Sequence, residues 1–376
     1  MDNQNKPNKI LISIWADPSN YLNLLFLINF LIKNNKKVIL VCKKIEKKSD
    51  FYYFVKKDYK LKVIEIKETG KYGYIKFFLN KIKLIKKLKF ETVISINFIS
   101  LFFSYFISFS SIKWIYYNFD FNNDKKFNFN NFLEKKIIQK VNYIFIPSNS
   151  RLRLYKKIFN RKKNIYPVYN SFSINFDIKN KSYLPIELKN KKFFIRLGSF
   201  YKHHGLVNLA LATKFWKTNT YLVMAGKSYD GYFQILKKLK KENNLTKLLL
   251  YENVSYKFWF GLLQKGIAGF ALYDPINVSH NLMGGTSQKL NNYIFAGIPS
   301  FVTNNKDFQI FNNKYKTSIL VSNNSVKEIN NGVNKILKNK KLYSTIKKKN
   351  NLAFKNEFNF EKQISIVKNI ILNDNL

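Results

Sequence analysis

The segment SQKLNNYIFAGIP, residues 287–299, has the pattern of a short helix that begins at Ser287 and stops at Gly297. Lys289 falls in its first turn, where the helix dipole is positive and a cation is unfavourable. An anion bound between the lysine and the free backbone N–H groups would reverse that cost. The sequence therefore predicts an anionic ligand at this helix start.

The loop before this helix supports the same interpretation. Gly284 and Gly285 allow a ligand to approach the backbone closely, and the hydroxyl of Thr286 or of Ser287 can cap the helix. Two hydroxyl groups, a helix N-terminus and Lys289 together form a plausible diphosphate cradle.

Two further glycines follow predicted strands. Gly198 ends the run FFIRLGS and precedes Lys202, and Gly226 ends TYLVMAG. In parallel sheets, ligands bind beyond the carboxyl ends of the strands, so these loops are candidate binding loops. His203 and His204 suggest a metal site, but neighbouring side chains diverge and no acid or cysteine flanks them. We expect no metal site. The loop either contacts a phosphate through Lys202 or is a plain polar loop before a helix.

Composition restricts the partner. The 376 residues contain 66 Lys and Arg against 22 Asp and Glu, a net charge of +44. Such a charge indicates an anionic partner: nucleic acid, an anionic membrane surface or a phosphorylated substrate. The stretch KIKLIKKLKF, 81–90, can lie on a membrane as an amphipathic helix, or can be a solvated basic face.

The location follows from a few local features. The N-terminus lacks the pattern of a signal peptide, and the single cysteine, Cys42, fits a reducing cytosol. The uncharged run at 92–112 is long enough to span a bilayer. Its serines and asparagines favour the alternative, a strand, a helix and a following strand. We therefore predict a cytoplasmic protein at the inner face of a membrane.

Apolar strands alternate with helical segments through both halves of the chain, which indicates parallel sheets covered on both faces. The fold class predicted is α/β, with two Rossmann-like, doubly wound parallel-sheet domains facing a central cleft. The expected boundaries are an N-terminal, acceptor-side domain at 1–178, a nucleotide-sugar-binding domain at 190–355, and a C-terminal helix at 356–376 that can cross back to the first domain.

The segment SQKLNNYIFAGIPSFVT resembles the part of GT-B glycosyltransferases, especially glycosyltransferase family 4, that reads roughly S/P-x-K-hydrophobic-x-E-Y-x-x-A-G-x-P. The resemblance covers most of 193–305. Over 1–180 it is limited to a general β/α pattern and to Asn170, which is similar to an interdomain asparagine of the family.

The resemblance implies a nucleotide-diphosphate sugar as donor substrate, with no metal or other cofactor required. Lys202 and Lys289 would contact the phosphates, Val254 would hold the base, and Tyr273 would line the sugar pocket. The full set of predicted donor-binding residues is Gly198, Lys202, Gly226, Val254, Tyr273, Ser287, Lys289, Asn292 and Tyr293.

Two departures from the family pattern affect the predicted chemistry. The family glutamate before the tyrosine is Asn292 here, and its partner eight residues earlier is Gly284. An amide binds a hydroxyl more weakly than a carboxylate does. All three histidines lie in the second half, so no N-terminal histidine base exists; the candidate catalytic residues are Asp120, slightly favoured, and Asp17.

The function expected from these features is transfer of a sugar from a nucleotide-diphosphate sugar to a lipid-linked acceptor or surface polysaccharide, with peripheral contact to an anionic membrane. One alternative is a basic nucleic-acid-binding protein, although no specific nucleic-acid-binding signature is present. The other is a GT-B-like protein without catalysis, which the missing glutamates keep open.

Overall fold

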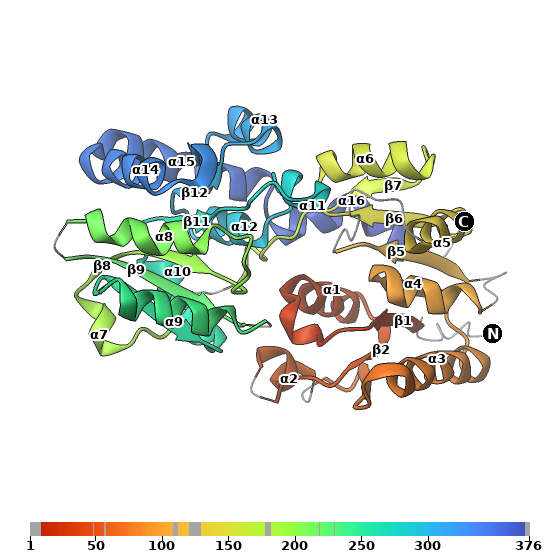
Figure 1. Cartoon of the computed structure of the whole chain (residues 1–376). Coiled ribbons are helices and arrows are strands. Elements are labelled where there is room, and N and C mark those ends of the chain that lie inside the picture. The colour runs from red at the N-terminus through yellow and green to blue at the C-terminus, as the bar shows by residue number, and fades with distance from the viewer. Residues whose placement is uncertain are drawn as a thin grey trace. The chain divides into compact units, whose positions relative to one another are not determined.

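The computed structural model describes residues 9–47, 49–55, 58–107, 112–119, 129–176, 182–217, 219–228 and 230–372. The chain forms two compact units. The N-terminal unit comprises Met1–Tyr169 with Phe360–Leu376, and the C-terminal unit comprises Asn170–Asn359. Each unit contains a parallel sheet with helices on both faces (Figure 1), which confirms the predicted α/β class with two doubly wound domains.

The sheet of the N-terminal unit has, in the described residues, seven parallel strands in the order β3-β2-β1-β4-β5-β6-β7. The strands are β1 (Lys9–Ile14), β2 (Lys37–Lys43), β3 (Leu61–Ile66), β4 (Thr92–Ile96), β5 (Lys113–Tyr117), β6 (Tyr143–Ile146) and β7 (Ile165–Pro167). The helices are η1 (Pro18–Asn20), α1 (Leu22–Lys33), α2 (Asp50–Val55), α3 (Gly70–Lys87), α4 (Asn97–Tyr105), α5 (Phe129–Ile138), α6 (Asn149–Phe159) and α16 (Phe360–Leu372).

The uncharged run at 92–112 forms β4 and α4 and leads into β5, as predicted. All five residues of β4 are buried, which explains why the strand contains no charge. Among the described residues, no helix is long and apolar enough to cross a membrane.

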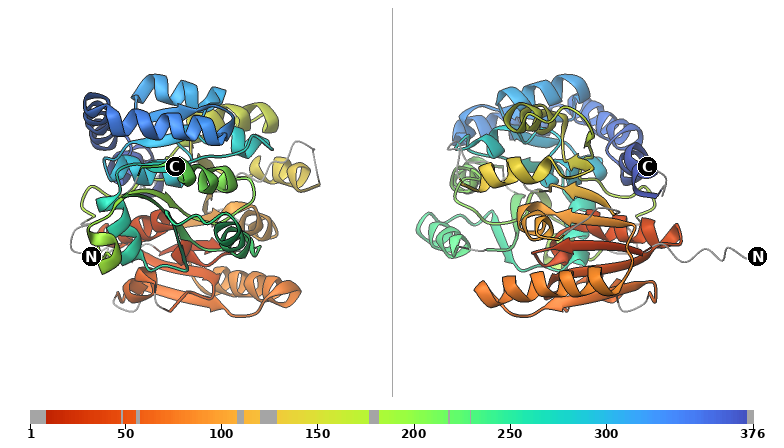
Figure 2. Two further views of the ribbon diagram at one scale, coloured as in Figure 1. Left: turned by 60° about the vertical axis from the view of Figure 1, so that its left-hand side comes forward. Right: turned by 90° about the vertical axis from the view of Figure 1, so that its right-hand side faces the viewer.

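Residues 81–87 of the basic stretch form the last turns of α3, which lies along one face of the sheet (Figure 2). Phe77, Lys81 and Leu84 face inward at helical spacing and are buried. The helix α16 covers the opposite face, where Ile364, Val367 and Ile371 pack with α1 and the central strands.

The sheet of the C-terminal unit has, as far as the chain is described, six parallel strands in the order β10-β9-β8-β11-β12-β13. The strands are β8 (Lys192–Leu197), β9 (Thr220–Gly226), β10 (Leu248–Glu252), β11 (Gly269–Ala271), β12 (Ser300–Thr303) and β13 (Ser318–Val321). The helices are α7 (Ile186–Lys189), α8 (Leu206–Ala212), η2 (Thr213–Phe215), α9 (Tyr232–Glu242), α10 (Tyr256–Lys265), α11 (Val278–Asn281), α12 (Gln288–Phe295), α13 (Lys306–Tyr315), η3 (Ser322–Asn324), α14 (Val326–Lys338) and α15 (Lys340–Asn356).

The strand order decides which loops meet. Because β8 lies between β9 and β11, the loops that follow these three strands leave the same edge of the sheet. The helix α12, which carries Lys289, packs against β11 and thereby brings its N-terminus to this edge.

Candidate functional site

Two of the predicted binding-loop glycines contact each other where β8 and β9 end: Gly198 follows β8, and Gly226 is the last residue of β9. The N–H of Gly198 donates to the carbonyl of Ala225 at 2.9 Å. A Cβ atom on Gly226 would lie 1.9 Å from the carbonyl oxygen of Gly198, so no side chain fits there. Gly198 itself has a φ of +111°, which disfavours any other residue. The two glycines therefore form a tight backbone platform.

Lys289 lies against this platform, although 91 positions separate it from Gly198. Its Cε atom is 3.2 Å from the place that a Cβ on Gly198 would occupy. Its Nζ atom donates to the hydroxyl of Tyr273 at 3.2 Å and lies 4.7 Å from the centroid of that ring. The hydroxyl of Tyr273 also shares a hydrogen bond of 2.7 Å with Ser287. Four predicted donor-binding residues thus meet in one cluster.

Ser287, and not Thr286, caps α12: its Oγ accepts from the N–H of Leu290 at 3.3 Å. The buried hydroxyl of Thr286 has no hydrogen-bond partner among the described residues. A buried hydroxyl without a partner is costly, and a bound ligand would satisfy it.

Arg196, which the sequence interpretation passed over, lies directly beneath the platform. It is fully buried in β8, and its guanidinium donates to the carbonyls of Gly198 and Ser199 and to Nδ1 of His204. Burial lowers the pKa of Arg196 to about 10, so it stays charged at neutral pH. The sequence contained one sign of this residue, because an arginine inside the otherwise apolar strand FFIRLGS is unusual.

The two cations lie close enough to affect each other. Burial, and then the charge of Arg196, hold the pKa of Lys289 well below its usual range. Neither residue forms a salt bridge with an acid in the described part of the chain. An anion bound here would offset both the burial and the repulsion, and would thereby favour the charged form of Lys289 beside Arg196.

Two histidines border the cluster and both are held neutral. Nδ1 of His204 lies 2.8 Å from the guanidinium of Arg196 and 3.2 Å from the carbonyl oxygen of Ser199. Because an arginine only donates, the shorter contact requires Nδ1 as the acceptor, with the ring proton on Nε2. Burial, and then the charges of Lys289 and Arg196, lower the pKa of His204 far below its usual value. His280 donates from Nδ1 to the carbonyl of Asp274 at 3.0 Å, and its ring centroid is 5.8 Å from that of His204.

Metal-ligand clusters are not found in this region. Among the described residues, no group of three or more His, Cys, Asp and Glu side chains converges as a metal site would require. Lys202 is exposed in the turn before α8, and no hydrogen bond within the described residues ties its ammonium to the Lys289 cluster.

Tyr293 has a structural role, and its predicted donor contact stays a prediction. It is fully buried, and its hydroxyl accepts from the N–H of Leu197 and donates to the carbonyl of Phe270, both at 3.2 Å. The ring fills the space above Gly269, where a Cβ would approach it to 2.3 Å. Tyr293 therefore ties α12 to β8 and β11 and fixes the position of Lys289.

Asn292 is buried in α12. The neighbouring Asn291 donates to the carbonyls of Gly285 and Asn170, both at 2.8 Å. Gly284 stands at the second position where the chain departs from the family pattern. Its N–H donates to a carboxylate oxygen of Asp307 at 2.6 Å. A Cβ on Gly284 would lie 2.9 Å from that oxygen, so α13 occupies the space of a side chain at 284.

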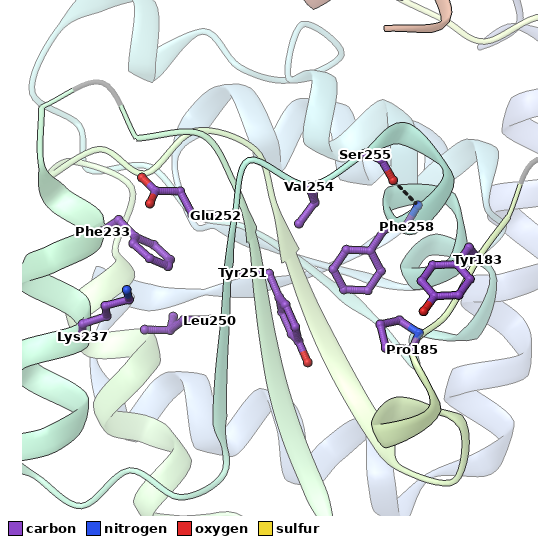
Figure 3. Close-up of a pocket in the computed structure, with 10 residues that line it drawn as sticks. All are labelled: Tyr183, Pro185, Phe233, Lys237, Leu250, Tyr251, Glu252, Val254, Ser255 and Phe258. Carbon is purple, nitrogen blue, oxygen red and sulfur yellow. Dashed lines mark hydrogen bonds between the residues drawn. The ribbon is translucent and has the colours of Figure 1, made fainter. Parts of the chain in front are cut away.

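Val254 lines a cavity of about 550 Å³ beside the edge strand β10 (Figure 3). The rings of Tyr251 and Phe258 meet there edge to face, with their centroids 4.9 Å apart. A backbone hydrogen bond ties this wall of the cavity to the platform. The N–H of Asn253, which lies between the lining residues Glu252 and Val254, donates to the carbonyl of Gly226 at 2.8 Å. The remaining lining residues are Tyr183, Pro185, Phe233, Lys237, Leu250, Glu252 and Ser255.

The two candidate catalytic acids belong to the N-terminal unit. Asp17 caps the short helix η1, where its carboxylate accepts from the N–H of Ser19 at 2.9 Å. Asp120 lies outside the described residues. The catalytic assignment of both stays a prediction.

No protein-family model matches the chain, and no curated protein sequence matches it. Solved structures do. Sucrose-phosphate synthase of Thermosynechococcus elongatus superposes with a TM-score of 0.74 at 11% identity, covering 97% of this chain and 98% of that one. HepE of Anabaena, in complex with UDP and glucose, gives 0.75 at 12% identity, covering 97% and 99%.

WaaG, a glycosyltransferase involved in lipopolysaccharide biosynthesis, gives a TM-score of 0.67 at 10% identity, covering 97% of this chain and 100% of that one. These identities are too low to transfer substrates, but similarity over the full length of both chains shows a shared architecture. Together with its two parallel-sheet units, it shows that this chain has the fold of the GT-B glycosyltransferases.

Proposed function

We propose that this protein transfers a sugar from a nucleotide-diphosphate sugar to an acceptor. The observation that carries the proposal is the pair of cations, Arg196 and Lys289, at the Gly198 platform without an acidic partner in the described residues. A diphosphate supplies two or more negative charges, which match this pair. The GT-B fold, and the structure of HepE with UDP-glucose, support a nucleotide sugar as the source of that diphosphate.

In the proposed binding mode the phosphates lie between Lys289 and the backbone at Gly198, close to the N-terminus of α12. The base lies near Val254, in the cavity beside β10. The sugar lies near Tyr273 and Asn292, where the hydroxyl of Thr286 provides a hydrogen-bonding group without a partner in the described structure.

The proposed reaction breaks the bond between the anomeric carbon and the diphosphate oxygen. The oxygen of the acceptor hydroxyl forms the new bond to that carbon, and its proton passes to Asp120 or Asp17. Negative charge grows on the leaving diphosphate as that bond breaks. Lys289 stabilises this charge directly, and Arg196 does so through the loop that it holds. Both positions are set before the reaction, so little reorganisation is needed. Because the two side chains can neutralise the diphosphate, we propose that no metal ion is required, and that Asp120 or Asp17 assists the acceptor.

The acceptor that we propose is a lipid-linked glycan or a surface polysaccharide at the inner face of a membrane. Support comes from the net charge of +44, which favours an anionic surface. It also comes from the similarity to WaaG, whose own function involves lipopolysaccharide.

Thermal unfolding with UDP-, GDP-, ADP- and CDP-sugars tests donor binding. A donor at a hundredfold excess over its Kd stabilises the folded state by about 2.7 kcal/mol, which raises Tm by about 5 to 10 °C. Lys289→Ala should abolish most of this shift, whereas Lys338→Ala, an exposed lysine on α14, should retain it. If no nucleotide sugar changes Tm or is hydrolysed, the proposal is wrong.

Turnover separates an active enzyme from a GT-B-like protein that only binds. Lys289→Ala should lower kcat/KM by a hundredfold or more, since it removes a charge next to the leaving group. Lys202→Ala should have a small effect because Lys202 is exposed. Donor binding with no transfer or hydrolysis would support the non-catalytic alternative.

A further inference from the structure

A groove lined by aromatic rings lies between α3 and α4 of the N-terminal unit. Its volume is about 550 Å³, and Leu133 of α5 closes one side. The rings of Phe78 and Phe103 are 5.6 Å apart, and those of Phe102 and Phe103 are 5.4 Å apart. The other lining residues are Lys71, Tyr74, Ile75, Phe98 and Ile99. Apart from the ends of Lys71 and Tyr74, these side chains offer a ligand no polar group.

Exposed apolar side chains surround this groove. Tyr72, Ile75 and Leu79 follow one another at helical spacing on α3 and are 82%, 55% and 56% exposed. Phe106, just after α4, and Phe132, on α5, are also exposed. Single exposed apolar residues are normal on a protein surface, but a set gathered on three neighbouring helices marks an interaction site.

The same helices carry a strong positive charge. The exposed lysines are Lys71, Lys76, Lys83, Lys86 and Lys87 on α3 and Lys135 and Lys136 on α5. Glu68, just before α3, is already paired with Lys76. The ammonium group of Lys136 lies 4.6 Å from the ring centroid of Phe132, so cations and aromatic side chains are interleaved. Lysines beside exposed aromatic and aliphatic side chains are typical of surfaces that lie in a membrane interface.

We propose that this surface, the α3–α4 groove with its lysine rim, binds an anionic phospholipid bilayer and that the groove takes one lipid acyl chain. The proposal rests on the membrane-associated acceptor proposed above, and it names the surface that brings the enzyme there. A hydrocarbon chain requires no hydrogen bonds, and the helical backbones on both sides of the groove offer none. The lysines can then contact lipid phosphates, since long side chains extend toward the headgroups.

Vesicle flotation with the full-length protein tests the surface. Vesicles of phosphatidylcholine with phosphatidylglycerol should bind the protein, and vesicles of phosphatidylcholine alone should bind it at least tenfold more weakly. Ile75→Asp places a carboxylate at the groove and should weaken binding at least tenfold. Ile235→Asp is the matched control, because Ile235 is a 51% exposed isoleucine on α9 of the other unit; its binding should equal that of the wild type. Equal binding by both variants would overturn the proposal.

Fluorescence separates acyl-chain insertion from attraction to the headgroups. The ring of Trp15 lies 4.6 Å from that of Tyr74, which lines the groove. Phospholipids brominated in the acyl chain should therefore quench part of the tryptophan emission, and Trp15→Phe should remove that part. Binding to anionic vesicles without such quenching would show attraction to charge alone and refute the groove as an acyl-chain site.

The outcome is independent of donor binding. Ile75→Asp should leave the thermal shift produced by nucleotide sugars unchanged, because the shift reports on the C-terminal unit. Groove-dependent vesicle binding without any donor shift would refute the proposed function and leave this inference standing. A donor shift without vesicle binding would support donor binding and refute the membrane surface proposed in this subsection.

Discussion

Lys81 is a buried lysine whose titration should make the stability of the N-terminal unit depend on pH. Its side chain is fully buried between α3 and α4, and its Nζ atom donates to the carbonyl of Ser100 at 2.9 Å and to the hydroxyl of Ser104. No acid pairs with it in the described part of the chain. Burial lowers its pKa from 10.5 to about 7.

The direction of the effect follows from this shift. Between the folded pKa of about 7 and the unfolded value of 10.5, the unfolded chain binds more protons than the folded one. The free energy of unfolding therefore rises with pH in this window, by about 1.4 kcal/mol per pH unit. From about pH 7 to pH 9 the gain is about 2 kcal/mol, and below pH 7 the full penalty of burying the charge is present.

Lys81→Met should remove this dependence, because methionine fills similar space without a charge. Urea unfolding of the wild type and of Lys81→Met between about pH 7 and pH 9 measures this dependence. Groups other than Lys81 titrate in both proteins, so their contributions cancel when one free energy of unfolding is subtracted from the other. The fluorescence of Trp114 is a suitable signal: its indole N–H donates to Ser95, which shares a hydrogen bond of 2.7 Å with Ser104.

The control is Lys83→Met, which alters an exposed lysine on the same helix. It should keep the pH dependence of the wild type, whereas the wild type should gain about 2 kcal/mol relative to Lys81→Met over that range. If the difference between wild type and Lys81→Met stays constant with pH, the buried site does not shift this pKa and the reasoning is refuted.

Two further predictions concern the platform. Gly226→Ala should destabilise the C-terminal unit by about 3 kcal/mol and abolish the donor thermal shift, because the added Cβ would clash with the carbonyl of Gly198. The control, Gly231→Ala, should cost about 1 kcal/mol, because its Cβ has open space and only the positive φ is unfavourable. Equal losses of stability in urea unfolding would contradict the steric argument. The ring of His204 should stay neutral from about pH 5 to 8 in ¹⁵N NMR, because its folded pKa is strongly lowered. Arg196→Met should move that pKa back toward its usual value, and a His204 that titrates normally in the wild type would contradict the lowered pKa. The same spectra show which nitrogen carries the proton, and a proton on Nδ1 would exclude the proposed tautomer.

The elements of the fold were largely readable from the sequence, because their signals are local. The predicted strand TYLVMAG coincides with β9, and the short helix predicted to begin at Ser287 and stop at Gly297 is α12. Continuous apolar runs of strand length indicate strands covered on both faces, and this pattern depends only on neighbouring residues. The cap at Ser287 belongs to the same class, since it joins groups three residues apart.

The site was readable only in part. The sequence predicted Gly198, Gly226 and Lys289, because glycines at strand ends and a lysine in a first helical turn are local oddities. It did not single out Arg196, whose contacts depend on the loop that folds over it, and the donor-binding role that it gave Tyr293 stays a prediction. Helical periodicity allows Tyr293 to face either way, and only the packing of α12 on β11 places its hydroxyl inside.

By itself, the sequence determined the alternating elements, the glycine loops that follow the strands, and a lysine in the first turn of a helix. The tertiary structure decided which of these residues meet, because the order β10-β9-β8-β11-β12-β13 brings together loops that are distant along the chain. It also decided the charge states. Desolvation depends on every neighbouring segment, so only the folded chain makes Lys81 and Lys289 unusual among so many lysines.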